Sequence, residues 1–104
     1  MALTHSPFVS TPDSKEWLPV RSSTYKGNPI HFADMVKYTD KLVGRVMNEL
    51  EKLHLKEKTL VIFTGDNGTS GAIISTLNGK PYPGGKGKTI DSGTHVPLIV
   101  SCSK

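Results

Sequence analysis

Apolar residues recur every three or four positions between residues 30 and 57, which is the spacing of one face of an α-helix. Asn28 is a suitable N-cap, and Pro29 suits the first helical position because the N–H that it lacks has no partner there. The pattern therefore predicts one long helix over residues 30–57. Its apolar stripe comprises Phe32, Met35, Val36, Leu42, Val43, Val46, Leu50 and Leu53.

Two shorter apolar runs, at residues 59–64 and 96–100, are typical of buried strands. Residues 1–29 are rich in proline, serine and threonine and are predicted to be loop. Residues 69–82 receive no assignment, and Asn78 to Pro83 is interpreted as a turn. A long helix with two strands predicts an α/β layer, forming a single partial domain over residues 1–104.

A sheet with so few strands leaves long unpaired edges. The sequence therefore predicts either a piece of a larger domain or a chain that completes itself with a partner. Exposed strand edges of this kind favour a homo-oligomer or a swapped dimer.

The composition of the chain limits the kinds of partner molecule that we expect it to bind. The chain has 104 residues and a formal net charge of +4, but its lysines and arginines are spread along the sequence rather than gathered in a block. This distribution does not favour nucleic-acid binding. No apolar run approaches the roughly 20 residues of a membrane-spanning helix, so we expect neither a nucleic-acid nor a membrane partner.

Asp66 and Asn67, between Gly65 and Gly68, directly follow the predicted strand. Ligands of α/β proteins gather at the carboxyl ends of strands, and carboxylate and amide oxygens are the ligands that hard divalent cations prefer. Residues 59–68 therefore predict a strand and a metal loop. An ordinary turn is the alternative, because Asp, Asn and Gly are also common turn residues.

A second glycine-rich segment carries Lys86 and Lys88, and its basic side chains suit a small anion. Gly87-Lys88-Thr89 matches the end of a phosphate-binding P-loop. However, Tyr82 occupies the position of that motif's first glycine, and no strand is predicted directly before it. The sequence therefore does not favour nucleotide binding. Residues 83–100 are interpreted as a lysine loop followed by a strand.

The order of these motifs resembles the second half of the catalytic domain of a sulfatase, in the alkaline phosphatase superfamily. The motifs are His5-Ser6-Pro7, the long helix, Gly65 to Gly68, Gly85-Lys86-Gly87, and Gly93 followed by Val96-Pro97. The resemblance implies a fragment of an alkaline-phosphatase-like sandwich, with one long helix and a few mostly parallel strands. It also implies a parent enzyme that hydrolyses sulfate esters, on a small molecule or a sulfated glycan.

The resemblance gives individual residues their expected roles. Asp66 and Asn67 correspond to a pair that binds a divalent cation, usually Ca²⁺. Lys86 corresponds to a lysine that contacts the sulfate, with Lys88 as its rival, and His5 to a histidine near the sulfate. Lys86 and His5 are thus the expected catalytic and substrate-binding residues. Members of the family are often exported, periplasmic or lysosomal, but this chain carries no recognisable signal and its compartment is left open.

Three departures from the sulfatase pattern limit this expectation. The Asp-Asp pair that completes the metal site is missing, so Ca²⁺ binding should be weak or absent. The Cys/Ser-x-Pro-x-Arg motif, whose first residue becomes formylglycine, is also missing, and Cys102 lies in no such context. His95 stands at the family's Arg position, and Asp91 could replace its Glu. The isolated chain is therefore expected to be inactive. The alternative is a non-catalytic α/β module that binds anions or a partner chain.

Overall fold

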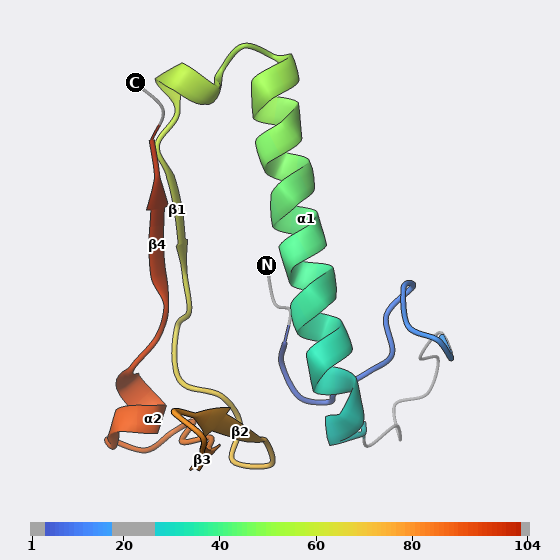
Figure 1. Cartoon of the computed structure of the whole chain (residues 1–104), viewed down its shortest axis with the longest axis vertical. Coiled ribbons are helices and arrows are strands. Elements are labelled where there is room, and N and C mark those ends of the chain that lie inside the picture. Colours follow the sequence, from blue (N-terminus) through green and yellow to red (C-terminus); the bar gives the residue numbers. More distant parts are fainter. Residues whose placement is uncertain (1–3, 18–26, 103–104) are drawn as a thin grey trace. The chain divides into compact units, whose positions relative to one another are not determined.

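The computed structural model describes residues 4–17 and 27–102, which belong to two compact units, Met1–Val46 and Met47–Lys104. The described elements are mixed α and β, with one long helix and short strands (Figure 1). Each unit has its own small set of buried residues. We describe them separately.

Unit 1 is organised around the start of the long helix. A 3₁₀ turn, η1 (Pro29–His31), precedes α1 (Phe32–Lys52). The Asn28 side chain accepts a hydrogen bond from the backbone N–H of Ile30 at 3.1 Å, which confirms the predicted N-cap. Pro29 opens the turn, as the sequence predicted.

The N-terminal segment of unit 1 packs on this helix start. The Phe8 ring meets the Phe32 ring edge-on, with centroids 5.7 Å apart. Phe8 and Met35 are both 4% exposed and form the core of the unit. The Asn28 N–H donates to the Phe8 carbonyl at 2.9 Å, which fixes the two segments together.

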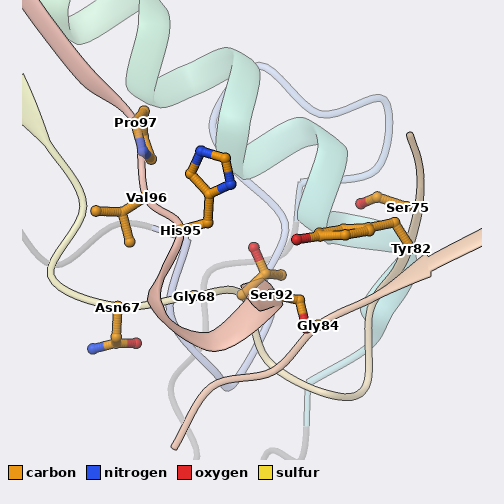
Figure 2. A pocket seen from close by; sticks show the side chains of 10 residues that line it. Asn67, Gly68, Ser75, Tyr82, Gly84, Ser92, His95, Val96 and Pro97 are labelled. Atoms are coloured by element: carbon orange, nitrogen blue, oxygen red, sulfur yellow. The ribbon is translucent and has the colours of Figure 1, made fainter. Parts of the chain in front are cut away.

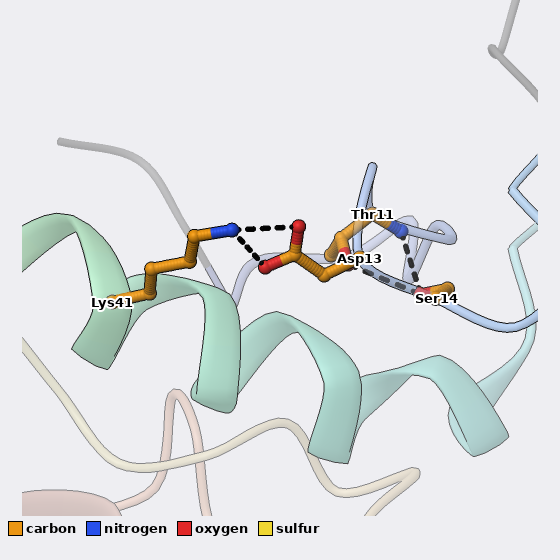
Figure 3. A network of polar contacts seen from close by, with 4 residues as sticks. All are labelled: Thr11, Asp13, Ser14 and Lys41. Atoms are coloured by element: carbon orange, nitrogen blue, oxygen red, sulfur yellow. Dashed lines mark hydrogen bonds and ion pairs between the residues drawn. The ribbon is translucent and has the colours of Figure 1, made fainter.

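A polar contact ties the same segment to a later turn of the helix (Figure 3). The Lys41 ammonium forms an ion pair with the Asp13 carboxylate at 2.5 Å. The Thr11 N–H donates to the Ser14 hydroxyl at 2.9 Å, which closes a small turn around Asp13.

The helix ends at Lys52, before the predicted end at residue 57. His54 adopts a positive φ of 54°, and the Leu55 N–H donates to the Leu50 carbonyl at 2.9 Å. This is the Schellman arrangement that terminates helices, here with a histidine in the position that usually holds glycine. A separate 3₁₀ turn, η2 (Lys56–Lys58), follows.

Unit 2 contains two pairs of strands. β1 (Val61–Thr64) pairs with β4 (Leu98–Ser101), and β2 (Ile74–Leu77) pairs with β3 (Lys80–Pro83). Both pairs are antiparallel, so the expectation of mostly parallel strands is wrong for the described sheets. The connection from β1 to β4 contains the hairpin and a short helix, α2 (Asp91–Thr94), and it returns the chain in the opposite direction.

The hairpin of β2 and β3 replaces the predicted turn over Asn78 to Pro83. Its two-residue connection is Asn78-Gly79, and both residues have positive φ, 51° and 76°. These angles are those of a type I′ turn, whose twist matches that of paired strands. Interpreting Asn78 to Pro83 as a turn was therefore wrong beyond Gly79, because Lys80 to Pro83 form a strand.

Candidate functional site

Asp66 and Asn67 lie where the sequence placed them, in the loop directly after β1. The Gly65 N–H donates to the Pro97 carbonyl at 3.4 Å, so the loop begins beside the segment that leads into β4. Asp66 is exposed and Asn67 is half-buried. The Asp66 carboxylate therefore remains accessible to a ligand.

The far end of this loop is fixed against α2. The Gly68 N–H donates to the Gly93 carbonyl at 2.8 Å. A Cβ atom on Gly68 would lie 2.0 Å from the Ser92 carbonyl oxygen, which no real side chain tolerates. Glycine at position 68 is what allows the metal loop to touch the backbone of α2.

The same short helix also contacts the lysine loop. A Cβ atom on Gly93 would lie 2.1 Å from the Lys88 carbonyl oxygen and 2.5 Å from that of Gly85. Gly93 is therefore packed between the two loops that the sequence assigned to cation and anion. This contact was not anticipated, because close approach of backbones leaves no pattern of side chains to recognise.

Lys86 belongs to the lysine loop. A backbone hydrogen bond joins this loop to the residue that directly follows the metal loop. The Lys86 N–H donates to the Thr69 carbonyl at 2.9 Å. The Lys86 and Lys88 side chains are both exposed. The structure thus brings the two loops together at the backbone, and the choice between Lys86 and Lys88 as the anion ligand stays a prediction.

His5 belongs to unit 1, and its ring Nδ1 contacts the Ser6 carbonyl oxygen. The side chain is exposed. Its expected role at the sulfate stays a prediction.

A small pocket of about 100 Å³ lies at the junction of the metal loop, the hairpin and α2 (Figure 2). Its lining includes Asn67 from the metal loop, Tyr82 from β3 and Ser92 and His95 from the α2 segment. In Figure 2 the Asn67 side chain projects away from His95 and Tyr82. The metal loop therefore borders this pocket, with the Asn67 amide on a different side from the imidazole and the phenol.

Two titratable side chains of the pocket lining, Tyr82 and His95, both contact Asp91, which lies outside the lining. The Tyr82 hydroxyl donates a hydrogen bond to Asp91 Oδ2, and His95 Nδ1 lies 3.4 Å from Asp91 Oδ1. The hydrogen bond to Asp91 raises the pKa of Tyr82, with smaller contributions from desolvation and from the negative charge of Asp91. Sequence reasoning missed Tyr82, because the residue was assigned to a turn.

Further features bear on ligands. Within residues 4–17 and 27–102, no three His, Cys, Asp or Glu side chains lie close enough together to hold a metal ion. In the same ranges no helix is both long and apolar enough to cross a membrane. Cys102 is an exposed free thiol.

Comparison with known proteins identifies the family. The sulfatase family model matches residues 4–104, which is almost the whole chain. The chain belongs to the sulfatase family. No solved structure is significantly similar to it.

Several curated sulfatases are similar to this chain. The N-acetylgalactosamine-6-O-sulfatase of Bacteroides thetaiotaomicron is 35% identical over 77 residues, covering 64% of this chain and 15% of that protein. The steryl-sulfatase of Homo sapiens is 34% identical over 88 residues, covering 76% of this chain and 15% of that protein. The N-acetylgalactosamine-6-sulfatase of Rattus norvegicus is 33% identical over 101 residues, covering 92% and 17%. This sulfatase chain thus spans a small part of the length of its relatives.

Proposed function

We propose that this chain forms part of the active site of an enzyme that hydrolyses sulfate esters. Membership of the sulfatase family supports the reaction class. The observation that carries the proposal is the backbone link between the two loops, from Gly68 to Gly93 and from Lys86 to Thr69. This link holds a carboxylate-bearing loop and an ammonium-bearing loop in one compact cluster.

Asp66 and Asn67 are the proposed cation ligands, with Ca²⁺ as the cation. Both residues offer oxygen atoms, which suits a hard cation, but Ca²⁺ takes six to eight oxygen ligands. The described donor set therefore fits one part of a calcium shell, and the other ligands must be water or groups from outside this cluster. A bound Ca²⁺ would polarise the sulfate oxygens as a Lewis acid.

Lys86 is the proposed sulfate ligand. Its ammonium is a compact charge that suits an oxyanion. The Lys86 N–H donates to the Thr69 carbonyl, so the backbone at this position is fixed without help from the side chain. The exposed side chain is consequently available to a ligand. His5 is proposed, on the family resemblance alone, as a hydrogen-bond donor to a sulfate.

We propose that the isolated chain binds sulfate but does not hydrolyse sulfate esters. No Cys/Ser-x-Pro-x-Arg motif occurs in its sequence, so the usual sulfatase nucleophile is absent from these 104 residues. The relatives are named for a sugar sulfate and for a steryl sulfate. On that basis the substrate is proposed only as a sulfate ester.

A pair of matched substitutions tests the sulfate assignment. Inorganic sulfate is titrated into the ¹⁵N-labelled chain with millimolar Ca²⁺ present, and binding is followed by NMR. Lys86→Met should weaken sulfate binding about 10-fold, as expected for loss of a charge-assisted contact. Lys88→Met removes the same charge two residues away and should have a much smaller effect.

The reverse ranking, with Lys88→Met the damaging change, would move the anion to the rival lysine. Equal small effects of both substitutions would mean that sulfate is held by general positive charge. In that case the proposal of a sulfate-binding active-site loop would fail.

A further inference from the structure

The chain contains two Asn-Gly dipeptides. Asn67-Gly68 belongs to the metal loop, and Asn78-Gly79 forms the tip of the hairpin of β2 and β3. Asparagine loses its side-chain amide most readily when glycine follows it, because glycine has no Cβ atom to obstruct its backbone nitrogen. Since the two dipeptides are the same, a difference in their reactivity must come from the fold around them.

Deamidation of asparagine needs water as its only co-reactant. The glycine backbone nitrogen attacks the side-chain carbonyl carbon and forms a new N–C bond. The bond to the side-chain amide nitrogen breaks, and ammonia leaves with the proton of the backbone nitrogen. Water then opens the resulting succinimide at either of its carbonyl groups, which gives aspartate or isoaspartate. The backbone nitrogen must therefore be able to leave its native position and approach the side chain.

In the metal loop this nitrogen is held in place. The Gly68 N–H donates to the Gly93 carbonyl at 2.8 Å. A Cβ atom on Gly68 would lie 2.0 Å from the Ser92 carbonyl oxygen, so the backbone has no room on that side. Rotation of the peptide would break the hydrogen bond and move the loop against α2. Reaction at Asn67 therefore requires the loop to separate from α2, and its rate falls with the population of that opened state.

At the hairpin tip the nitrogen is accessible. Asn78 and Gly79 are exposed, and a Cβ atom on Gly79 would meet nothing within 4 Å. Within residues 4–17 and 27–102, no backbone carbonyl outside the hairpin accepts a hydrogen bond from the Gly79 N–H. The turn depends on the pairing of two four-residue strands. A short two-stranded hairpin is marginally stable in water, so its tip opens at a low free-energy cost.

We propose that Asn78 is a site of spontaneous deamidation and that contact with α2 protects Asn67 from the same reaction. The modification then affects the hairpin and spares the metal loop. Isoaspartate at position 78 lengthens the backbone at the tip, which a two-residue type I′ turn does not accommodate. Ser75 and Tyr82 pair across this hairpin and line the pocket, so the modification disturbs one wall of the pocket. This inference does not depend on the proposed function.

The test measures deamidation of both asparagines in the folded chain at mildly alkaline pH, by peptide mapping with mass spectrometry. The same measurement is repeated in concentrated urea. In the folded chain, Asn78 should react at least about 10-fold faster than Asn67, because only Asn67 must wait for its loop to open. In urea the two rates should agree within about twofold, because the fold no longer distinguishes the sites. Equal rates in the folded chain, or faster reaction at Asn67, would overturn the inference.

A pair of alanine variants tests what protects Asn67. Gly93→Ala leaves both dipeptides intact, but its Cβ atom would lie 2.1 Å from the Lys88 carbonyl oxygen. The clash displaces Gly93 and with it the carbonyl that holds the Gly68 N–H. Deamidation of Asn67 should then accelerate toward its rate in urea, while that of Asn78 stays the same. Gly44→Ala, whose Cβ atom would meet nothing within 4 Å, should leave Asn67 protected.

A third variant identifies the reactive residue. Asn78→Asp removes the amide and keeps a dipeptide, Asp-Gly, that suits the hairpin turn. It should abolish most of the ammonia released by the folded chain, and undiminished release would contradict the assignment. A folded Gly93→Ala chain in which Asn67 stays protected would show that contact with α2 is not the cause. If Gly93→Ala does not fold, which circular dichroism shows, the comparison of the folded and urea-unfolded natural sequence still decides.

Discussion

Each unit of this sulfatase chain is stabilised internally by a different balance of contacts. In unit 1, side-chain packing dominates, with Phe8 on Phe32, the buried Met35 and the ion pair of Asp13 with Lys41, while Gly27 alone brings its backbone close to that of Phe8. In unit 2, the loop cluster is held by positions that have no side chain. Gly68 and Gly93 let backbones approach to distances that any Cβ atom would prevent.

The difference has a consequence for function. Where backbones carry the packing, neighbouring side chains need not be buried to hold the structure. Asp66 and Lys86 are exposed although the loops that carry them are fixed. A ligand site needs its side chains on rigid backbone, and the hydrogen-bonded loops supply that support.

The largest expected effect on stability concerns the side-chain core of unit 1. Met35→Ala should lower the free energy of unfolding by about 2–5 kcal/mol, because Met35 is buried and its truncation leaves a cavity. Urea unfolding followed by circular dichroism measures the loss. Val46→Ala, at an exposed position of the same helix, is the control and should cost much less. Equal costs for the two would show that unit 1 has no side-chain core.

The next effect concerns the backbone packing of unit 2. Gly68→Ala should destabilise the chain by about 1–3 kcal/mol, because the new methyl group would overlap the Ser92 carbonyl and force the loops apart. Calcium and sulfate binding should weaken together, since one contact positions both loops.

Gly44→Ala provides the matched control for this substitution. Gly44 lies inside α1, and a Cβ atom added there would meet nothing within 4 Å. Alanine at this position should raise stability by about 0.5–1 kcal/mol, because it is the better helix former. If both glycine variants behaved alike, the close approach at Gly68 would not be what holds the loops.

The contrast between the units also bears on what the sequence could reveal. The helix start at Asn28 and Pro29, the strand before Asp66 and the loop after it follow from local signals, and the structure has them where these signals indicate. The end of α1 was missed because His54 takes a positive φ, and a histidine in the sequence does not indicate that conformation. Strand direction was wrong because apolar runs do not encode pairing partners.

The candidate site was predicted from the sequence only in part. Asp66, Asn67 and Lys86 were proposed from the order of the motifs, which also indicated the sulfatase family, and their roles stay predictions. Tyr82 was missed because prolines on either side of it indicated a turn, although Asn78-Gly79 is a recognised hairpin signal. The role of Gly93 was hidden because its contacts are between backbones distant in sequence.

The smallest expected effect is a titration at the pocket. The folded pKa of Tyr82 is raised above its unfolded value by the hydrogen bond to Asp91, so the stability this contact provides is full below the unfolded pKa. That stability is lost as the pH rises through the folded pKa. Asp91→Asn should bring the pKa of Tyr82 down toward its ordinary value. Alkaline titration of the Tyr82 ring by NMR measures the change, and an unchanged pKa would show that Asp91 does not hold the phenol.

The linkage between calcium and sulfate tests most directly whether the two loops form one site. Sulfate affinity of the chain is measured by NMR titration with and without Ca²⁺, and again in Asp66→Asn. If the metal loop and the lysine loop form one pocket for a cation and an anion, Ca²⁺ should raise sulfate affinity several-fold, and Asp66→Asn should abolish that gain. Sulfate affinity that is the same with and without Ca²⁺, while each ligand still binds, would contradict the account.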